Sequence, residues 1–313
     1  MATELVNHLV AQPTHTLVYD AAYNMPSVGP QGLKYQHVFE ALPPHLQSAV
    51  VAPPALADPA LSHTAEYMEA LQDPNIIRAI LEDPDMSDAD AEAVRSAQHW
   101  HYSGSLFATQ CALRDGFAVN LGGGLHHASR EGGGGFCIYN DITACVEWLL
   151  STGAAKRVLI VDLDAHQGNG YETDLQEACR KGQVCVLDAY APMLFPFPHG
   201  EEASESIHYF IPYIKEDRGD IFIPQLLEGL TLALDEFYPD FVIYNAGSDP
   251  LEGDPLTGLS QTEEAILDRD YAVVEMCRRA HTPVMMCLSG GYQPRCAEVH
   301  AASLCRLLDA DKN

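Results

Sequence analysis

An apolar segment that ends in a cluster of polar residues is the feature that most constrains how this chain folds. Residues 157–163 read Arg-Val-Leu-Ile-Val-Asp-Leu, and Asp164, His166, Gly168 and Gly170 follow closely. The length of the segment and its β-branched residues fit a strand that is buried on both faces. Open α/β sheets bind ligands at the carboxyl ends of their strands. We therefore expect a ligand site at the end of this strand.

Asp162, Asp164 and His166 are spaced two residues apart, so their side chains point to the same side of an extended segment. Carboxylate oxygens and an imidazole nitrogen that converge on one point can bind a divalent metal ion. The alternative is that Asp164 caps the following turn and His166 is an ordinary loop histidine. This segment alone leaves both interpretations open.

The rest of the chain alternates between short apolar segments and amphipathic ones. We expect strands at 16–20, 117–121, 158–163, 184–187, 207–214, 241–245 and 283–288, and helices at 35–41, 63–71, 88–113, 141–151, 171–180, 223–237, 262–279 and 297–308. Asp-Pro pairs indicate a loop at 71–87. The alternation predicts an α/β fold with a single doubly wound, mainly parallel sheet and helices on both faces. We expect residues 1–313 to form one domain.

The charge balance excludes one class of partner. The chain has 17 Lys and Arg against 44 Asp and Glu, a formal net charge of −27. Nucleic-acid binding requires basic residues that neutralise phosphates, so we expect no nucleic-acid partner. An acidic surface can attract cationic ligands such as lysine side chains or polyamines, or it can simply keep the protein in solution.

The nine cysteines are scattered, odd in number and free of any Cys-x-x-Cys pair. This pattern is typical of free thiols in a reducing compartment. The N-terminus has no signal peptide pattern, and no segment has the ~20 apolar residues that span a membrane. We expect a cytoplasmic protein, or a nucleocytoplasmic one in a eukaryote.

Two glycine-rich stretches, 122–124 and 132–135, flank His126 and His127. Glycine lets the backbone approach a ligand closely, so these stretches indicate the wall of a narrow site. A phosphate-binding loop is a rival interpretation, but the Lys-Ser or Lys-Thr of a P-loop is missing. A His-His pair is often incidental. Beside a metal site it becomes a candidate acid and base, because imidazole titrates near neutral pH.

Two further strand ends carry polar residues. Asp249 follows the expected strand at 241–245 and can complete the metal site, whereas Glu252 and Asp254 are expected to be solvated or to form turns. Tyr292 follows a Gly-Gly pair after the last expected strand. Its phenol can enter the same crevice, or the ring can serve only in packing.

Taken together, these motifs resemble the histone deacetylase family, and most closely its class IV branch. The segments that carry the resemblance are 122–128, 133–142, 162–170, 244–258 and 289–293. Their order is the family's order. The clear similarity extends over about 116–292, and the first hundred residues match only loosely.

The resemblance implies a role for each residue of the site. Asp164, His166 and Asp249 would bind one catalytic Zn²⁺, although this set of ligands also fits iron or cobalt. His126 and His127 would be the catalytic pair and Tyr292 the electrophilic tyrosine. Asp162 would hold His126. Asp162 and Asp188, with the backbone carbonyls of Asp164 and His166, would bind a monovalent cation, expected to be structural K⁺.

The resemblance also implies a tunnel for the acyl group. Gly135 and Phe136 would line it, Phe195 or Phe197 would face them, and Leu256 would be a further substrate-binding residue. Many relatives have an aspartate where this chain has Asn169. Since an amide orients the second histidine without a negative charge, we expect His127 to be a weaker base here.

These roles predict a zinc-dependent amidohydrolase that cleaves N-acyl-lysine. Metal-activated water would attack the amide. Resemblance to class IV suggests long fatty-acyl chains, but the acyl group stays open, because the aromatic, proline-rich segment 190–198 can wall a tunnel for a long chain or narrow one for acetyl. The expected partner is an acylated lysine peptide or a cationic small amide. One alternative is an acetylpolyamine or other small-amide amidohydrolase, and another is a non-catalytic binder of acyl-lysine. A dimetal hydrolase fits less well, because few carboxylates are left for a second metal. The sequence leaves the oligomeric state open.

Overall fold

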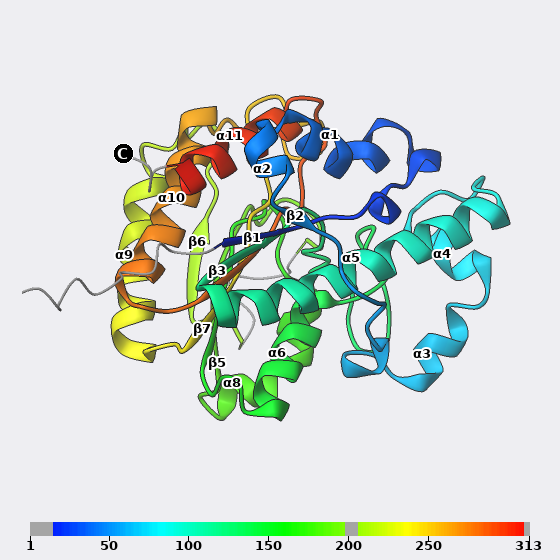
Figure 1. Cartoon of the computed structure of the whole chain (residues 1–313), viewed down its shortest axis with the longest axis horizontal. Coiled ribbons are helices and arrows are strands. Elements are labelled where there is room, and N and C mark those ends of the chain that lie inside the picture. Colours follow the sequence, from blue (N-terminus) through cyan, green and yellow to red (C-terminus); the bar gives the residue numbers. More distant parts are fainter. Residues whose placement is uncertain (1–14, 198–205, 310–313) are drawn as a thin grey trace, which may run out of the picture.

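The computed structural model describes residues 15–197 and 206–309. Within these residues the strands form a single eight-stranded sheet with the order β2-β1-β3-β8-β7-β4-β5-β6 (Figure 1). Every pair of neighbouring strands is parallel. The strands are β1 (His15–Val18), β2 (Val50–Val51), β3 (Phe117–Asn120), β4 (Val158–Asp162), β5 (Val184–Tyr190), β6 (Tyr209–Pro212), β7 (Phe241–Asn245) and β8 (Val284–Cys287).

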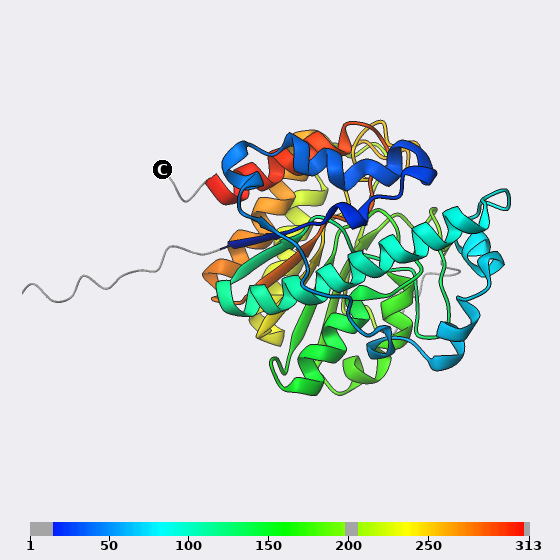
Figure 2. The same ribbon diagram turned by 45° about the vertical axis from the view of Figure 1, so that its right-hand side comes forward.

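Helices cover both faces of the sheet, as Figures 1 and 2 show. They are α1 (Lys34–Ala41), α2 (Pro44–Gln47), α3 (Ala65–Ala70), α4 (Pro74–Ile80), α5 (Asp88–Asp115), α6 (Asp141–Thr152), α7 (Asn169–Asp174), α8 (Gln176–Arg180), α9 (Phe222–Phe237), α10 (Glu263–Arg279) and α11 (Cys296–Asp309). The expected α/β architecture, one doubly wound sheet between two layers of helices, is confirmed.

The alternation of side chains along the strands separates two hydrophobic cores. In β4, Leu159 and Val161 belong to one core, together with residues of α1, α9, α10 and α11. Val158 and Ile160 point to the opposite face and pack with residues of α3 to α6 and α8. A strand with apolar residues on both faces is buried on both faces, which is why the segment lacks the polar alternation of a surface strand.

The predicted loop at 71–87 is wrong, because it contains helix α4 (Pro74–Ile80). The Asp73-Pro74 pair starts the helix instead of preventing it. The carboxylate of Asp73 accepts a hydrogen bond from the Asn75 N–H at 2.9 Å, and Pro74 occupies the first helical turn. Proline is favoured there because its missing N–H would have no partner in any case.

One other expectation needs correction, and one strand was not expected. The single helix expected at 171–180 is two short helices, α7 and α8, which meet at Leu175. The structure also contains β2 (Val50–Val51), a two-residue edge strand that pairs with β1 and that the sequence did not reveal. Two apolar residues between prolines carry too little periodicity to identify a strand.

The order of the central strands decides which loops meet. In β4, β7 and β8, the residues Asp162, Asn245 and Cys287 lie side by side in register. Because all three strands are parallel, the segments that follow them leave the sheet at the same edge. Those segments begin at residues 163, 246 and 288, and they carry the polar motifs seen in the sequence.

All nine cysteines lie within the described residues and none forms a disulfide; eight of them are buried and Cys305 is partly buried. The expectation of free thiols is confirmed. Of the helices described here, none combines the length and the apolar character that crossing a membrane requires.

Candidate active site

Three side chains from two strand ends converge at the edge of the sheet. Asp164 and His166 follow β4, and Asp249 follows β7. The Nδ1 atom of His166 lies 3.0 Å from Asp164 Oδ1 and 2.9 Å from Asp249 Oδ2. One ligand atom from each residue lies within 4.8 Å of the other two, and all three residues are buried.

The chemistry of this group fits a metal cation. Two carboxylates that lie close together away from water hold a proton or bind a cation, because neither charge is solvated. Burial and the neighbouring charge of Asp164 raise the pKa of Asp249 to about 7. Burial lowers the pKa of His166, but the two carboxylates raise it more, to about 11. Oxygen and imidazole donors of this kind suit Zn²⁺.

The surrounding backbone holds the two carboxylates in place. Oδ2 of Asp164 accepts hydrogen bonds from the Ser289 hydroxyl at 3.1 Å and from the Gly290 N–H at 3.0 Å. Oδ1 of Asp249 accepts one from the Ala165 N–H at 3.0 Å. A Cβ atom at Gly290 would lie 2.3 Å from Asp164 Oδ2, so only glycine permits this approach.

His126 lies on the charged, inner side of the cavity. Its Nδ1 donates to Asp162 Oδ2 at 2.9 Å, and its Nε2 lies 3.7 Å from Asp164 Oδ1. Burial lowers the pKa of His126, but the charges of Asp162 and Asp164 raise it more, to about 9. The imidazole is therefore a cation near neutral pH. The Asn245 side chain also donates to Asp162, at 2.9 Å.

His127 is the next residue, but the hydrogen-bond partner of its ring is a neutral amide. Its Nδ1 lies 2.7 Å from the side-chain oxygen of Asn169. Burial and the positive charge of His126 hold the pKa of His127 well below its usual range. The two rings are 4.1 Å apart between centroids, so one imidazole is charged and its neighbour is neutral.

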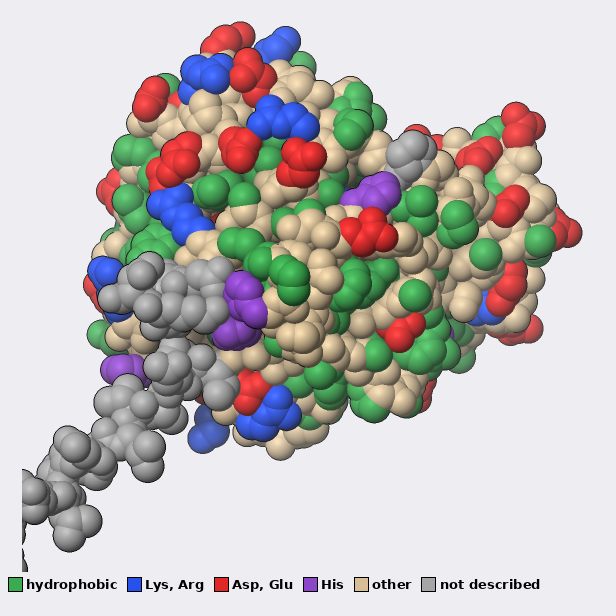
Figure 3. All heavy atoms as spheres, turned by 45° about the horizontal axis from the view of Figure 1, so that its top comes forward, with side chains coloured by type: hydrophobic (Ala, Val, Ile, Leu, Met, Phe, Trp, Pro, Cys, Tyr) green, Lys and Arg blue, Asp and Glu red, His purple; other side chains and the backbone are tan. Residues whose placement is uncertain are grey.

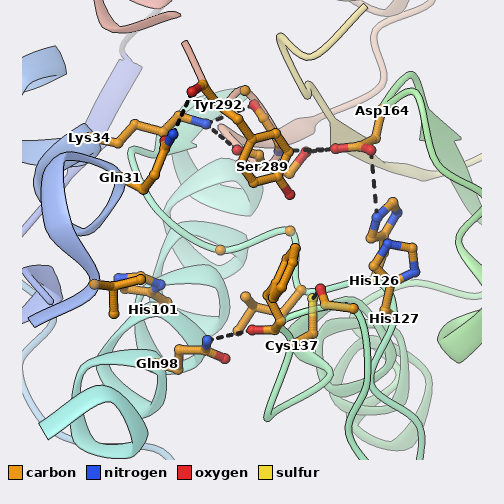
Figure 4. A pocket seen from close by; sticks show the side chains of 18 of the residues that line it. Gln31, Lys34, Gln98, His101, His126, His127, Cys137, Asp164, Ser289 and Tyr292 are labelled. Atoms are coloured by element: carbon orange, nitrogen blue, oxygen red, sulfur yellow. Dashed lines mark hydrogen bonds and ion pairs between the residues drawn. The ribbon is translucent and has the colours of Figure 1, made fainter. Parts of the chain in front are cut away.

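Tyr292 faces the histidine pair across the cavity. Figure 4 shows its phenol pointing into the space that also contains the rings of His126 and His127. Burial and the charges of Asp164 and Asp249 raise the pKa of Tyr292 well above its usual range. The phenol therefore keeps its proton and can donate a hydrogen bond.

Asp162 and Asp188 lie side by side in β4 and β5. Oδ2 of Asp188 accepts the Gly168 N–H at 3.1 Å, while its Oδ1 is buried and has no hydrogen-bond partner among the described residues. Burial and the charge of Asp162 raise the pKa of Asp188 well above its usual range. An unpaired buried carboxylate oxygen beside a second carboxylate fits a bound cation.

Two connected cavities border these groups. The inner cavity has a volume of about 340 Å³ and extends past the histidine pair to residues of α1 and α5. The outer cavity, about 420 Å³, opens beside His127 and Tyr292. Gly135, Phe136 and Leu256 line one or both of them, as expected for substrate-binding residues.

Phe195 and Phe197 take different positions in the outer cavity. The Phe195 ring lies 4.9 Å from the His127 ring, whereas Phe197 is 58% exposed at the rim. Gly135 lies between Phe195 and His127, because a Cβ atom at this glycine would be 2.3 Å from His127 and 2.9 Å from Phe195. Phe136 faces Tyr292 with 6.4 Å between ring centroids.

The structure adds residues that the sequence did not reveal. Lys34 is buried, and its ammonium group donates to the carbonyls of Ser289 and Gly290. The Gln31 amide donates to the carbonyl of Tyr292 (Figure 4). Both come from the N-terminal part of the chain, where no motif indicated a role in the site.

Asp141 and Arg269 do not line the cavities but form hydrogen bonds with the backbone of segments that carry site residues. The carboxylate of Asp141 accepts the N–H groups of Gly124 and Leu125, both at 2.8 Å, and so holds the loop that carries the histidine pair. The buried guanidinium of Arg269 donates to the Leu163 carbonyl at 2.9 Å. Leu163 stands between the two aspartates that end β4.

The acidic loop after β7 is only partly as expected. Glu252 is exposed and pairs with Arg218 at 3.2 Å, in line with a solvated role. Asp254 is buried and accepts the Tyr292 N–H at 2.8 Å, so of its two expected roles, solvated or turn-forming, it does not have the first. Its turn-forming role is also present, since it accepts the Leu256 N–H at 2.9 Å.

Comparisons with known proteins agree with this geometry. Residues 34–308 match the family described as "Histone deacetylase domain". "Histone deacetylase 2" of Arabidopsis thaliana is 40% identical over 201 residues, which cover 64% of this chain and 51% of the relative. "Acetoin utilization protein AcuC" of Bacillus subtilis is 33% identical over 152 residues, which cover 46% and 38%.

A third relative matches over a longer segment. "Acetoin utilization protein AcuC" of Staphylococcus aureus (strain MRSA252) is 29% identical over 249 residues, which cover 74% of this chain and 63% of that protein. The chain thus matches between 38% and 63% of the lengths of these relatives. The family match itself spans most of the 313 residues and includes every site residue that was expected from the sequence. The chain therefore belongs to the histone deacetylase family.

Proposed function

We propose that this protein is a zinc-dependent amidohydrolase that removes acyl groups from N-acyl-lysine, and that its whole chain forms one catalytic domain. The observation that carries the proposal is the convergence of three groups on one cavity. A histidine pair with unequal charges, a protonated phenol and Asp164 border the inner cavity, and Asp164 belongs to a buried Asp-His-Asp cluster whose His166 lines the outer cavity. Amide hydrolysis uses a Lewis acid, a base and an oxyanion donor.

Asp164, His166 and Asp249 would hold the metal. A bound Zn²⁺ polarises the substrate carbonyl and lowers the pKa of a water molecule. The two carboxylates balance the charge of the cation, which tempers its acidity. A base from the protein is therefore needed as well.

His127 is placed to be that base. It is neutral, because burial and the charge of His126 hold its pKa low. Its Nδ1 is occupied by Asn169, which leaves Nε2 to accept the proton from the attacking water. The neutral partner makes His127 a weak base, so the lowered pKa of the water has to compensate for it.

His126 and Tyr292 would stabilise the negative charge that develops on the amide oxygen. His126 supplies a positive charge, which Asp162 maintains. Tyr292 supplies an O–H donor that burial keeps protonated. Donors fixed before the reaction cost no reorganisation when charge develops. One of the two histidines then protonates the leaving amine.

We propose that Asp162 and Asp188 bind a structural K⁺. The unpaired Oδ1 of Asp188 and the closeness of the two carboxylates support this assignment. The cation would offset the negative charge behind His126 and so fix the position of Asp162.

We further propose that the acyl group is longer than acetyl, as in the class IV branch. The inner cavity of about 340 Å³ supports this, because a methyl group would fill only a small part of it. Its lining includes the apolar side chains of Met25, Val28 and Leu81. These residues come from the N-terminal part of the chain, beyond the histidine pair.

The rim of the outer cavity favours a protein substrate over a small amide. Phe136, Met193, Phe197 and Leu256 line this cavity and are 37%, 84%, 58% and 45% exposed. Exposed apolar side chains around a cavity are typical of a surface that contacts another macromolecule. Acidic side chains are instead scattered over the face shown in Figure 3, so charge alone indicates no single docking patch there.

The test compares three substrates with one enzyme preparation. The purified protein is stripped of metal with a chelator, reloaded with Zn²⁺, and assayed with acetyl-lysine peptide, myristoyl-lysine peptide and acetylputrescine. We expect metal-dependent hydrolysis that is fastest for the myristoyl peptide. Faster cleavage of the acetyl peptide contradicts the long-chain proposal, and faster cleavage of acetylputrescine contradicts the protein substrate. Zinc binding without hydrolysis of any of the three would favour a non-catalytic acyl-lysine binder.

A further inference from the structure

The segment that carries Tyr292 has little conformational restraint of its own. It follows β8 as Ser289-Gly290-Gly291-Tyr292, and Gly291 has a φ of 126°. Two consecutive glycines allow many backbone conformations, so the place of the phenol depends on contacts with other parts of the chain.

Most of those contacts hold the glycines rather than the tyrosine. The Gly290 N–H donates to Asp164, and the Gly290 carbonyl accepts from the Ser248 N–H at 2.9 Å and from Lys34 at 2.7 Å. These bonds fix the start of the segment against the metal cluster. They stop one residue before Gly291, where the left-handed conformation occurs.

Asp254 is the residue that holds the N–H of Tyr292. Its Oδ2 accepts that N–H at 2.8 Å, and its Oδ1 accepts the N–H of Leu256 at 2.9 Å. The side chain is 3% exposed. A hydrogen bond from a backbone N–H to a buried carboxylate is stronger than one between neutral groups. A single carboxylate thus joins the tyrosine segment to the loop that begins with Asp249.

Gln293 makes a second, weaker connection between the same two segments. Its amide donates to the carbonyls of Leu251 and Glu252 at 3.4 and 3.2 Å. On the other side, Gln31 donates to the Tyr292 carbonyl (Figure 4). The peptide groups on both sides of the Tyr292 Cα are therefore held, and among the residues that the structure describes Asp254 is their only charged partner.

We propose that Asp254 is a positioning residue that fixes the phenol of Tyr292 over the metal cluster. This inference rests on the proposed function, in which Tyr292 stabilises the developing oxyanion. Asp254 does not reach the reacting atoms itself. It acts by setting the direction in which the chain leaves Gly291, and a small displacement of a donor lowers its effect on the rate steeply.

The first test is the variant Asp254→Asn. The amide offers one acceptor where the carboxylate offers two, and its NH₂ group faces an N–H donor. We expect kcat on the best acyl-lysine peptide to fall about tenfold, because the phenol is displaced and not removed. KM and the zinc content are expected to stay at the wild-type values. A raised KM with unchanged kcat would show that Asp254 acts through Leu256, and would overturn the proposal.

A double-mutant cycle with Tyr292→Phe identifies the route of the effect. If Asp254 acts through the phenol, adding Asp254→Asn to Tyr292→Phe lowers kcat by less than about twofold further, because coupled residues are not additive. An equal loss in both backgrounds would mean that Asp254 supports the loop in general, and would overturn the proposal. Glu252→Gln is the matched control, since this exposed acid lies in the same loop; we expect near wild-type kcat.

Hydrogen exchange supplies a readout that needs no substrate. The amide of Tyr292 is protected by its bond to Asp254. The peptide that contains residues 289–293 should therefore exchange faster in Asp254→Asn than in the wild type or in Glu252→Gln. Unchanged exchange would overturn the proposal even if activity falls. If the wild type cleaves no acyl amide at all, the proposed function fails, and the exchange experiment still decides whether Asp254 fixes this segment.

Discussion

The cavity has two sides that differ in charge although they share one loop. The inner side consists of His126, Asp162, Asp164, His166 and Asp249, all buried and strongly coupled. The outer side places His127 beside a neutral amide and several apolar residues, which are Asn169, Phe136, Phe195 and Leu256. The two adjacent histidines are both buried, but His126 is cationic and His127 is neutral, because their hydrogen-bond partners differ.

This contrast assigns separate tasks to the two sides. The inner side holds charge, so it suits a metal ion and a developing oxyanion. In the proposed function, the outer side would supply a base without a permanent charge, together with the apolar wall for the substrate.

The largest predicted effect comes from removing a metal ligand on the inner side. Asp249→Ala leaves His166 with one carboxylate, and we expect loss of Zn²⁺ and a fall in kcat on the order of a thousandfold or more. Metal analysis and steady-state kinetics measure both. The chelated wild type should show the same loss, and added Zn²⁺ should restore the wild type but not the variant. Full activity in the metal-free wild type would refute a role for the cluster in catalysis.

The second prediction removes the charge that keeps His126 protonated. In Asp162→Asn the pKa of His126 falls, since Asp162 is the largest of the charges that raise it to about 9. We expect kcat to fall about a hundredfold near neutral pH, as for the loss of one oxyanion stabiliser. The loss should shrink as the pH is lowered and His126 regains its proton. A constant loss at every pH would break the proposed difference between the two sides.

The sequence predicted the inner side well and the N-terminal contribution not at all. Asp164, His166 and Asp249 are close in space because β4 and β7 are parallel neighbours, so their loops leave the sheet at one edge. The alternation of apolar and amphipathic segments predicted the parallel sheet, whereas the strand order comes from the structure. Lys34 and Gln31 reach the site through a long excursion of 3₁₀ and short α-helices. Tertiary packing, rather than a local pattern, places them there.

Asp254 shows a second limit of the sequence. An acid in a loop with glycines and prolines is usually solvated, as Glu252 is. Asp254 is buried instead, because it accepts a hydrogen bond from the N–H of Tyr292, which lies 38 residues away in the chain. No local pattern distinguishes the two acids, since their difference lies in what packs against them.

The third prediction gives the outer side a negative charge. In Asn169→Asp a carboxylate replaces the amide at His127 Nδ1, so the pKa of His127 rises. The base must be neutral to act, so activity is lost as the pH falls through its pKa. The acid limb of the kcat profile therefore moves to higher pH than in the wild type.

The control for this variant is Asn75→Asp, which adds the same charge at an exposed position of α4. Its profile should match the wild type. If the acid limb of Asn169→Asp does not move, His127 is not the group that titrates, and the assignment of the base to the outer side is wrong.

The smallest predicted effect tests whether the outer side only binds. Leu256 is 45% exposed and lines both cavities. Leu256→Ala removes about 0.5 kcal/mol of apolar contact, or roughly a twofold rise in KM. We expect kcat to stay unchanged, because no charge of the inner side is altered. Leu227→Ala on α9, 39% exposed and outside both cavities, is the matched control and should leave KM unchanged. A fall in kcat for Leu256→Ala would mean that the rim also orients the reacting amide, since Leu256 shares the carboxylate of Asp254 with Tyr292.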